Sequence, residues 1–288
     1  MSNMDLSVVD AFGEEWAKFD HPELESPELS SLFELYFSIF PWKTLPSTAV
    51  GFDLGCGTAR WAHFVAKRVG HLHCIDPSSA AIDVARRNLH GHTNCSFHCA
   101  SVEEIPLADG SADFGYSLGV LHHVPDAQQG IRACVRKLKP GAPLLLYLYY
   151  AFENRPKWFR AVWRVTDWMR RVISALPFGV RGPLCDLIAA VVYWPLARIS
   201  KLGQMLGVKV DHLPLSAYRD RSFYSMRTDA LDRFGTRLEK RFTRRQIRSM
   251  MEGAGLEGIV FSETPHWCAV GYRKHGVPGG MTTAPVGQ

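Results

Sequence analysis

The sequence predicts an α/β fold with a mostly parallel sheet and helices on its faces. Short apolar segments alternate with helical patterns between residues 50 and 150, a glycine turn follows the first apolar segment, and an acid ends the second. Strands that alternate with helices imply right-handed crossovers, and the ligand site then lies at the carboxyl ends of the strands. We therefore look for functional residues in the loops at that edge.

The first expected strand ends at Asp53 and is followed by a turn, Gly55-Cys56-Gly57. Two glycines let the backbone turn tightly and approach a ligand at the start of a helix, where unpaired N–H groups lie. A nucleotide-like ligand is expected there.

Two common nucleotide loops are excluded. The dinucleotide fingerprint needs a third glycine three places after the second, and this chain has Arg60 there. Asp53 would also repel a pyrophosphate and suits a ligand that carries a cation. A Walker loop is excluded because no Gly-x-x-x-x-Gly-Lys-Ser/Thr pattern occurs.

The second expected strand, residues 71–76, ends in Asp76. A carboxylate at this place can accept both hydroxyls of a ribose. Pro77 and Ser78 then open a helical pattern that runs to Leu89. Asp76 can also be an ordinary helix cap, but the nearby glycine turn favours the ribose interpretation.

Three more strands are expected at residues 97–101, 112–120 and 144–150. A motif with two histidines, residues 121–126, follows the fourth strand. A helix then runs to Leu138 and is followed by a turn at residues 139–141.

Four motifs together resemble those of the class I S-adenosylmethionine-dependent methyltransferases, in particular the subgroup that acts on small molecules. They are Asp53-Leu54-Gly55-Cys56-Gly57-Thr58, Asp76, Leu121-His122-His123-Val124-Pro125-Asp126 and Leu138-Lys139-Pro140-Gly141. The likeness covers roughly residues 48 to 150, and residues 243 to 274 are similar to the family's closing helix and two strands. It implies a Rossmann-like, seven-stranded, mostly parallel sheet with flanking helices, a helical insertion after the fifth strand, and S-adenosylmethionine as cofactor.

The resemblance also assigns roles by position. The residues that it implies for cofactor binding are Asp53, Gly55, Cys56, Gly57, Thr58, Asp76, Pro77, Ser101, Val102, Ser117, Leu118 and His122. Two positions depart from the family pattern. Ala59 replaces a glycine, which is harmless only at negative φ. Ser101 replaces the acid that usually contacts the adenine, and Glu103 is a candidate substitute.

Methyl transfer from a sulfonium is an in-line displacement, so catalysis mainly requires that the acceptor atom is aligned with the methyl group. A proton acceptor is needed only where the nucleophile must lose a proton, and histidine is the usual one near neutral pH. His122 and His123 are the first histidine candidates, and we predict catalytic roles for His122, Tyr150 and Tyr218. At most one of Tyr149 and Tyr150 faces the reacting centre, because adjacent strand residues point to opposite faces.

No metal is expected, because no cluster of histidines and cysteines has the spacing of zinc ligands. The seven cysteines are odd in number and lie mostly in apolar segments, which favours a reducing cytoplasm.

The chain of 288 residues is expected to form one catalytic domain. Its parts are an N-terminal helical arm or lid (1–46), a cofactor-binding core (47–150), a helical substrate-recognition insertion (151–242), a closing helix with two strands (243–274) and a disordered tail (275–288). Residues 151–250 hold about 20 Lys and Arg against about 8 Asp and Glu, so the net charge of +5 hides a basic insertion.

The insertion shows two helical patterns, residues 157–176 and 182–206. One face of the first holds Trp158, Val162, Val165, Met169 and Val172, and most arginines lie elsewhere. Such a helix usually packs by its apolar face, and it can also rest on anionic lipid as a peripheral contact. No transmembrane segment is expected, because the apolar runs are shorter than the roughly twenty residues that span a bilayer.

The segment of residues 211–227 is expected to be irregular, to fold over the carboxyl edge of the sheet and to bind an anionic small acceptor. Arginines pair with carboxylate or phosphate groups, and tyrosines offer a hydroxyl on a rigid ring. The substrate-binding candidates are Trp16, Asn154, Arg219, Arg221 and Tyr224. The alternative is internal pairing of these arginines with Asp220, Asp229, Asp232 and Glu239.

Three other functions stay open. The basic insertion suits an RNA methyltransferase, but the fourth strand lacks the Asp/Asn-Pro-Pro-aromatic motif of enzymes that methylate base amines, so a nucleic acid partner is not expected. Enzymes of the same fold can use S-adenosylmethionine for cyclisation or alkyl transfer. A non-catalytic binding module is the third alternative. The acceptor and the oligomeric state do not follow from the sequence.

Overall fold

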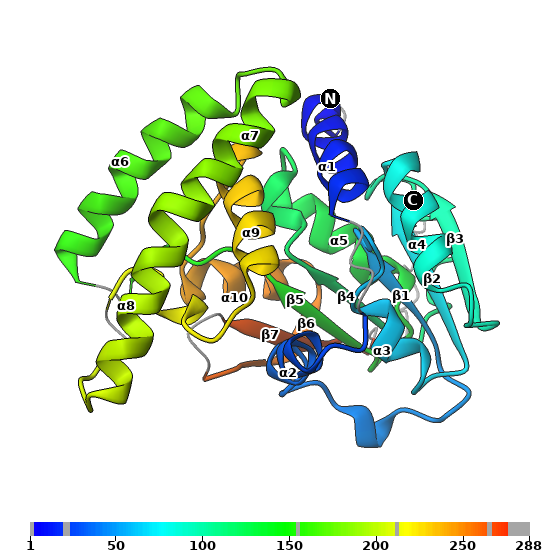
Figure 1. Ribbon diagram of the computed structural model, residues 1–288. Coiled ribbons are helices and arrows are strands. Elements are labelled where there is room, and N and C mark those ends of the chain that lie inside the picture. Colours follow the sequence, from blue (N-terminus) through cyan, green and yellow to red (C-terminus); the bar gives the residue numbers. More distant parts are fainter. Residues whose placement is uncertain (1–2, 20–23, 154–155, 211–212, 264–266, 276–288) are drawn as a thin grey trace, which may run out of the picture.

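The computed structural model describes residues 3–19, 24–153, 156–210, 213–263 and 267–275. Its seven strands form one sheet in the order β3-β2-β1-β4-β5-β7-β6, with helices on both faces (Figure 1). The strands are β1 (Val50–Leu54), β2 (His71–Asp76), β3 (Cys95–Cys99), β4 (Phe114–Leu118), β5 (Pro143–Tyr147), β6 (Leu256–Phe261) and β7 (Cys268–Arg273). Strands β1 to β5 pair in parallel, and β7 is antiparallel to both β5 and β6. The expected seven-stranded, mostly parallel fold is confirmed.

The described helices connect and cover these strands. They are α1 (Leu6–Lys18), α2 (Pro27–Tyr36), α3 (Ala62–Ala66), α4 (Ser79–Asn88), α5 (Ala127–Lys137), α6 (Lys157–Ile173), α7 (Phe178–Ile188), α8 (Trp194–Met205), α9 (Phe223–Gly235) and α10 (Arg244–Gly253). Short 3₁₀ turns are η1 (Trp42–Thr44), η2 (Leu121–His123) and η4 (Ser216–Tyr218), and η3 (Ala189–Tyr193) is a π-helical turn that joins α7 to α8.

Helix starts follow the side chains that can cap them. The hydroxyl of Ser26 accepts the Leu29 N–H at 3.3 Å at the start of α2, and Ser78 accepts the Ala81 N–H at 3.3 Å at the start of α4. The expected strand 71–76 and the helix expected after Ser78 are confirmed. The expectation of an irregular chain through residue 227 is wrong, because Ser222 caps a helix that begins at Phe223.

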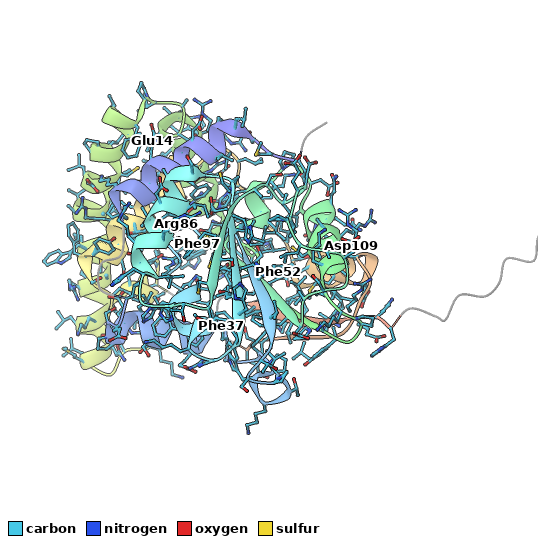
Figure 2. All side chains as sticks on the ribbon, turned by 90° about the vertical axis from the view of Figure 1, so that its right-hand side faces the viewer. Glu14, Phe37, Phe52, Arg86, Phe97 and Asp109 are labelled. Carbon is cyan, nitrogen blue, oxygen red and sulfur yellow. The ribbon has the colours of Figure 1, made fainter. Side chains whose placement is uncertain are left out.

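Two apolar clusters pack on the two faces of the sheet. On one face, Phe33 and Phe37 of α2 lie against the strands with at most 2% of their surface exposed. On the other face, Phe52 packs with residues of α5 and α10. Figure 2 shows Phe37 and Phe52 inside the molecule, whereas Asp109 lies at its outside. The aromatic stripe of α2 thus fixes the N-terminal arm on the sheet.

The insertion forms a helical layer beside the carboxyl edge of the sheet (Figure 1). Helix α9 lies at its centre and contacts α1, α6, α7 and η3. The buried side chains between these helices include Phe19, Tyr193, Met226 and Phe234. The insertion therefore has a small core of its own, to which α1 contributes.

Helix α6 is rotated so that the apolar stripe, which its sequence favours as the packed side, faces outward. The stripe that was expected to pack is exposed, with Val165 at 62% and Val172 at 50%, whereas Asp167 and Arg170 are buried. Arg170 donates to Asp167 at 2.9 Å and to the carbonyl of Thr236 at 2.8 Å, so paired polar groups hold this helix to the protein.

One helix in the described part of the chain is long and apolar enough to cross a membrane, judged by length and composition only. It is Phe178–Met205, with 28 residues, and 28% of its most apolar stretch is buried. The sequence analysis expected no helix of this kind, because Arg181, Asp186 and Arg198 divide the segment into shorter apolar runs.

Candidate active site

A cavity of about 690 Å³ opens at the carboxyl edge of the sheet. Its wall combines α1 and α2, the loops after β1, β2 and β4, the chain after β5, and parts of α6, η3, α8 and α9. The N-terminal arm, the core and the insertion therefore meet at one site, as expected for a ligand site in a parallel sheet.

The glycine turn after β1 forms the floor of one end of the cavity. Gly55 and Gly57 have φ angles of +75° and +53°, which favour glycine. A Cβ on Gly55 would lie 2.3 Å from Cγ2 of Val120. The N–H groups of Gly55 and Cys56 donate to the carbonyl of Ile75 at 2.7 and 3.1 Å, so β2 holds the turn in place.

Asp76 lies on the cavity wall beside this turn. Its Oδ2 accepts the Gly57 N–H at 3.0 Å, and its Oδ1 accepts the Ser78 N–H at 2.9 Å. Burial raises the pKa of Asp76 to about 6, although both backbone hydrogen bonds lower it, so the carboxylate is largely ionised at neutral pH. Each oxygen keeps a further lone pair, so the carboxylate can accept two neighbouring ligand hydroxyls.

Trp16 of α1 covers the glycine turn. A Cβ on Gly57 would lie 3.1 Å from Nε1 of Trp16, and the Arg60 guanidinium lies 5.6 Å from the centre of the Trp16 ring. Phe19, just after the end of α1, is instead buried in the core of the insertion. Helix α1 therefore places one aromatic side chain over the loop and another against α9.

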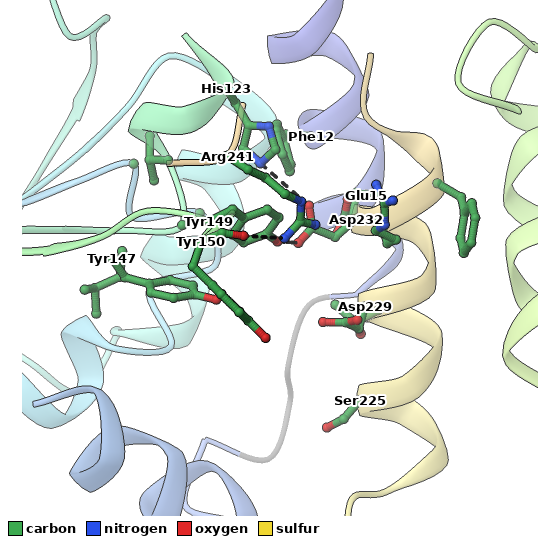
Figure 3. Close-up of a pocket in the computed structure, with 18 of the residues that line it drawn as sticks. Phe12, Glu15, His123, Tyr147, Tyr149, Tyr150, Ser225, Asp229, Asp232 and Arg241 are labelled. Atoms are coloured by element: carbon green, nitrogen blue, oxygen red, sulfur yellow. Dashed lines mark hydrogen bonds and ion pairs between the residues drawn. The ribbon is translucent and has the colours of Figure 1, made fainter. Parts of the chain in front are cut away.

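His123 lines the opposite part of the cavity (Figure 3). Its Nδ1 lies 2.6 Å from the carbonyl oxygen of Leu238. A carbonyl only accepts, so Nδ1 carries the proton and Nε2 of the neutral ring is an acceptor. Nε2 is buried without a hydrogen-bond partner.

Asp232 of α9 faces this histidine. Its Oδ2 accepts the hydroxyl of Tyr149, and its Oδ1 has no hydrogen-bond partner. The distance from Oδ1 to Nε2 of His123 is 3.8 Å. A donor placed between them could hydrogen-bond to both atoms.

The charge state of this pair follows from its burial. Burial lowers the pKa of His123 to about 4, although the bond to Leu238 raises it. Burial raises the pKa of Asp232 to about 6, although the hydrogen bond from Tyr149 lowers it. Burial also raises the pKa of Glu15 well above its usual value. At neutral pH the histidine is neutral and Asp232 is largely ionised.

Comparison with known proteins gives the same picture of the core. Residues 52–146 match the methyltransferase domain family. The chain is 30% identical over 226 residues to the ubiquinone biosynthesis O-methyltransferase of Hahella chejuensis, which covers 72% of this chain and 93% of that protein. The chain belongs to the class I S-adenosylmethionine-dependent methyltransferases. This methyltransferase uses S-adenosylmethionine and acts on a small molecule.

Further relatives support the same family and fold. The methyltransferase is 35% identical over 107 residues to the ubiquinone biosynthesis O-methyltransferase of Alkalilimnicola ehrlichii, or 36% of this chain and 42% of that one. Among solved structures, its fold is similar to that of the Haloferax volcanii methyltransferase in complex with the activator Trm112. The TM-score is 0.50, the identity is 13%, and the match covers 94% of this chain and 99% of that chain. It is also similar to phosphoethanolamine N-methyltransferase 2 of Haemonchus contortus, with a TM-score of 0.50, 14% identity, and coverage of 88% and 42%.

The predicted cofactor residues fall into two groups in the methyltransferase. Those that line the cavity are Gly55, Cys56, Gly57, Thr58, Asp76, Pro77, Ser101, Val102 and Leu118. Asp53, Ser117 and His122 do not line it. Ser117 donates its hydroxyl to the carbonyl of Leu54 at 3.0 Å, so it supports the turn from below. The wall fits the cofactor, because a buried, ionised Asp76 is free to accept ribose hydroxyls beside the glycine turn.

The two departures from the family pattern have different outcomes. Ala59 adopts a φ of +61°. Alanine in place of the family's glycine was expected to be harmless only at negative φ, and this residue does not have it. Glu103 does not line the cavity, and its Oε1 accepts the N–H of Asn3 at 2.7 Å. It thus holds the start of the N-terminal arm.

The predicted substrate residues are placed differently from one another. Trp16 and Arg221 line the cavity, whereas Arg219 and Tyr224 do not. Arg219 donates to Oε1 of Gln204 at 2.7 Å, and its Nε lies 3.8 Å from Oδ2 of Asp220, one of the acids that the internal-pairing alternative names. Tyr224 packs edge-on against Phe19. Asn154 lies outside the described residues.

Among the predicted catalytic residues, Tyr150 and Tyr218 line the cavity and His122 does not. His122 is fully buried, and its ring stacks on Tyr149 with 3.8 Å between ring centres. Its neighbour His123 has the ring that reaches the cavity. The sequence analysis considered both histidines and assigned the catalytic role to His122, whereas the structure places His123 on the cavity wall.

Asp232 and Glu15 were not among the predicted site residues. Tyr149 was considered only as an alternative to Tyr150, yet both tyrosines line the cavity. Asp232 had been considered only as a pairing partner for arginines. Its signal in the sequence is the pair Asp229 and Asp232, three residues apart and therefore on one helix face. Within the described ranges, no group of three or more His, Cys, Asp or Glu side chains could hold a metal ion.

Proposed function

We propose that this methyltransferase methylates a hydroxyl oxygen of a small, partly apolar acceptor. The observation that carries the proposal is a pair of unpartnered acceptor atoms on the cavity wall, Nε2 of His123 and Oδ1 of Asp232. Buried polar atoms normally have hydrogen-bond partners, so this end of the cavity calls for a donor on the ligand. A hydroxyl group supplies one.

The same atoms disfavour an anionic group at this end. Asp229 and Asp232 would repel a carboxylate or phosphate. The arginines nearby are already paired, because Arg233 and Arg241 bind Glu239 at 3.1 and 2.8 Å. We therefore propose a neutral donor here, and the anionic acceptor expected from the sequence is not part of the proposal.

Apolar and aromatic side chains form much of the remaining wall. They include Phe159, Val162 and Trp163 of α6, Tyr147 at the end of β5, and Tyr150 after β5. Such a surface suits the apolar part of an acceptor. The printed name of the Hahella chejuensis relative, an O-methyltransferase, supports oxygen as the atom that is methylated.

The proposed chemistry divides the work between the chain and its cofactor. The glycine turn and Asp76 would hold the cofactor, which would supply an activated methyl group and leave as a neutral thioether. Nε2 of His123 accepts the proton of the acceptor hydroxyl as its oxygen gains the methyl group. The carboxylate of Asp232, 3.8 Å away, stabilises the imidazolium that results.

Tyr149 and Leu238 position this pair. Tyr149 donates to Oδ2 of Asp232, which leaves Oδ1 directed at the histidine. The Leu238 carbonyl fixes the tautomer of His123, so that the unprotonated nitrogen faces the cavity. Tyr149 itself is held by the stacked ring of His122.

The test uses three acceptors with the same alkyl chain: a 4-alkylcatechol, a 4-alkylaniline and a 4-alkylbenzoate. Each is incubated with the enzyme and S-adenosylmethionine, and products are identified by mass spectrometry. The proposal predicts a methyl ether of the catechol and little product from the other two. Preferred methylation of the aniline or the benzoate would contradict it.

A cytoplasmic location is part of this proposal. It is supported by the seven cysteines, all of which are free thiols in the structure.

A further inference from the structure

Large apolar side chains are exposed mainly on the insertion. Of the 20 that are exposed among the described residues, 16 lie between Trp158 and Val208, so they concentrate on one part of the molecule. Helix α6 contributes Trp158, Val162, Val165, Trp168, Met169 and Val172, and the helix Phe178–Met205 contributes eight more. We call these exposed apolar residues the insertion face. Apolar surface of this extent marks an interaction site.

The two charged residues of α7 face the protein. Arg181 of α7 is buried and pairs with Glu14 at 2.9 Å. Asp186 of α7 binds Lys18 at 2.8 Å and Arg227 at 2.9 Å. These pairs fix the rotation of the helix, so the outward direction of its apolar side is a property of the fold.

Basic residues flank the insertion face. Residues 157–209 hold nine Lys and Arg and two Asp and Glu. Lys157, Arg160 and Arg164 of α6 are exposed beside the apolar stripe. The only acid of α6, Asp167, is taken by Arg170 and Arg171. The flanks therefore keep their positive charge.

The cavity reaches this face. Val162 and Met169 of α6 and Val192 of η3 line the cavity, yet they are 48%, 38% and 40% exposed. One set of apolar side chains thus belongs both to the cavity wall and to the insertion face. An apolar group could pass from outside to the acceptor site between α6 and η3.

We propose that the insertion face docks on a bilayer that contains anionic lipid, and that the apolar part of the acceptor enters from the bilayer between α6 and η3. The exposed tryptophans Trp158, Trp168 and Trp194 suit the interfacial region, and the flanking basic residues suit anionic headgroups. The docking stands by itself. The route of the acceptor rests on the proposed function.

Two other arrangements fit the observations less well. A symmetric pair of copies would bring the same patch together, with basic flanks against basic flanks. Insertion of Phe178–Met205 across the bilayer would break the ion pairs of Arg181 and Asp186 and place both charges in lipid. The helix therefore lies on the membrane surface.

The first test is co-sedimentation of the whole enzyme with vesicles at low salt. Wild type is expected to bind vesicles of phosphatidylcholine and phosphatidylglycerol at least tenfold more tightly than phosphatidylcholine alone, and added salt should weaken binding. The double variant Val165→Glu/Val172→Glu should lose at least tenfold. Neither residue lines the cavity, and both are exposed, so the fold should persist, as circular dichroism can verify.

Val260→Glu is the matched control, because Val260 is 53% exposed on β6, away from the insertion. It should bind vesicles like wild type. The docking proposal is overturned if wild type does not bind the anionic vesicles, if Val260→Glu loses as much as the double variant, or if sedimentation shows a dimer that the double variant dissociates while vesicle binding stays unchanged.

The second test addresses the route of the acceptor. With a long-chain alkylcatechol in anionic vesicles, the double variant should show a KM raised at least tenfold, whereas KM for free catechol in solution should not change. Equal KM values for the membrane-held acceptor would overturn the route. Vesicle binding without methylation of either catechol would contradict the proposed function while the docking stands.

Discussion

Replacement of Gly55 by alanine tests the physical basis of the cofactor loop. The residue has a φ of +75°, where an L-residue loses roughly 1 to 2 kcal/mol. The added Cβ would also lie 2.3, 2.6 and 2.9 Å from Cγ2, Cγ1 and Cβ of Val120. Rotation of the valine cannot relieve the contact with its Cβ. Overpacking of this kind costs about 1 to 3 kcal/mol.

The two effects predict that Gly55→Ala lowers the free energy of unfolding by about 2 to 5 kcal/mol. Urea unfolding followed by circular dichroism measures this loss, and calorimetric titration of S-adenosylmethionine should show weaker binding to the variant. The loss is a large share of the roughly 5 to 15 kcal/mol typical of a domain, so the assay should resolve it easily.

Two matched glycines separate the causes. Gly207 has a φ of +77° with no atom within 4 Å of the added Cβ, so Gly207→Ala should lose only the strain of about 1 to 2 kcal/mol. Gly91 has open space and no positive φ, so Gly91→Ala should be neutral or gain up to about 1 kcal/mol. A Gly55→Ala variant no less stable than Gly207→Ala would refute the steric part of this reasoning.

Three further predictions concern the site and the core. Asp76→Asn should weaken S-adenosylmethionine binding by about tenfold or more, measured by calorimetry, with exposed Asp83→Asn unchanged as control. Burial raises the pKa of Asp53 to about 8, so the stability contributed by its protonated form is lost as pH rises from about 4 to 8. The stability of Asp53→Asn relative to wild type should therefore increase by about 3 kcal/mol between pH 5 and pH 7 in urea unfolding, and a difference independent of pH would count against it. Phe37→Ala should cost about 3 to 5 kcal/mol, because the ring is 2% exposed and stacks in the aromatic cluster; a loss below about 1 kcal/mol would show that the site collapses.

Features set by neighbouring residues were predictable from the sequence. The acid that ends β2, the cap of α4 at Ser78 and the glycine turn depend on local backbone chemistry, and these elements lie where the sequence places them. The cofactor followed from the same local motifs together with a family resemblance. The mostly parallel sheet followed from the alternation of strands and helices.

Features set by contacts distant in the sequence were not predictable. The pattern of α6 shows an apolar stripe, but which side packs is decided by Arg170 reaching the carbonyls of Thr236 and Arg237. Likewise, His123 faces the cavity because Leu238 binds its Nδ1, and Asp232 joins it from α9. No spacing within residues 121–126 carries that information.

The central claim is that His123 and Asp232 take the proton of an acceptor hydroxyl. The pH dependence of kcat/KM for the alkylcatechol tests it most directly. The active form needs both groups unprotonated, so wild-type activity should rise about tenfold per pH unit below about pH 6 and level off above it. Asp232→Asn should lose this inflection and at least about tenfold in kcat/KM. Asp229→Asn, which removes a carboxyl of similarly raised pKa that binds Tyr218 instead, should keep the inflection. An Asp232→Asn enzyme with the wild-type profile would contradict the account.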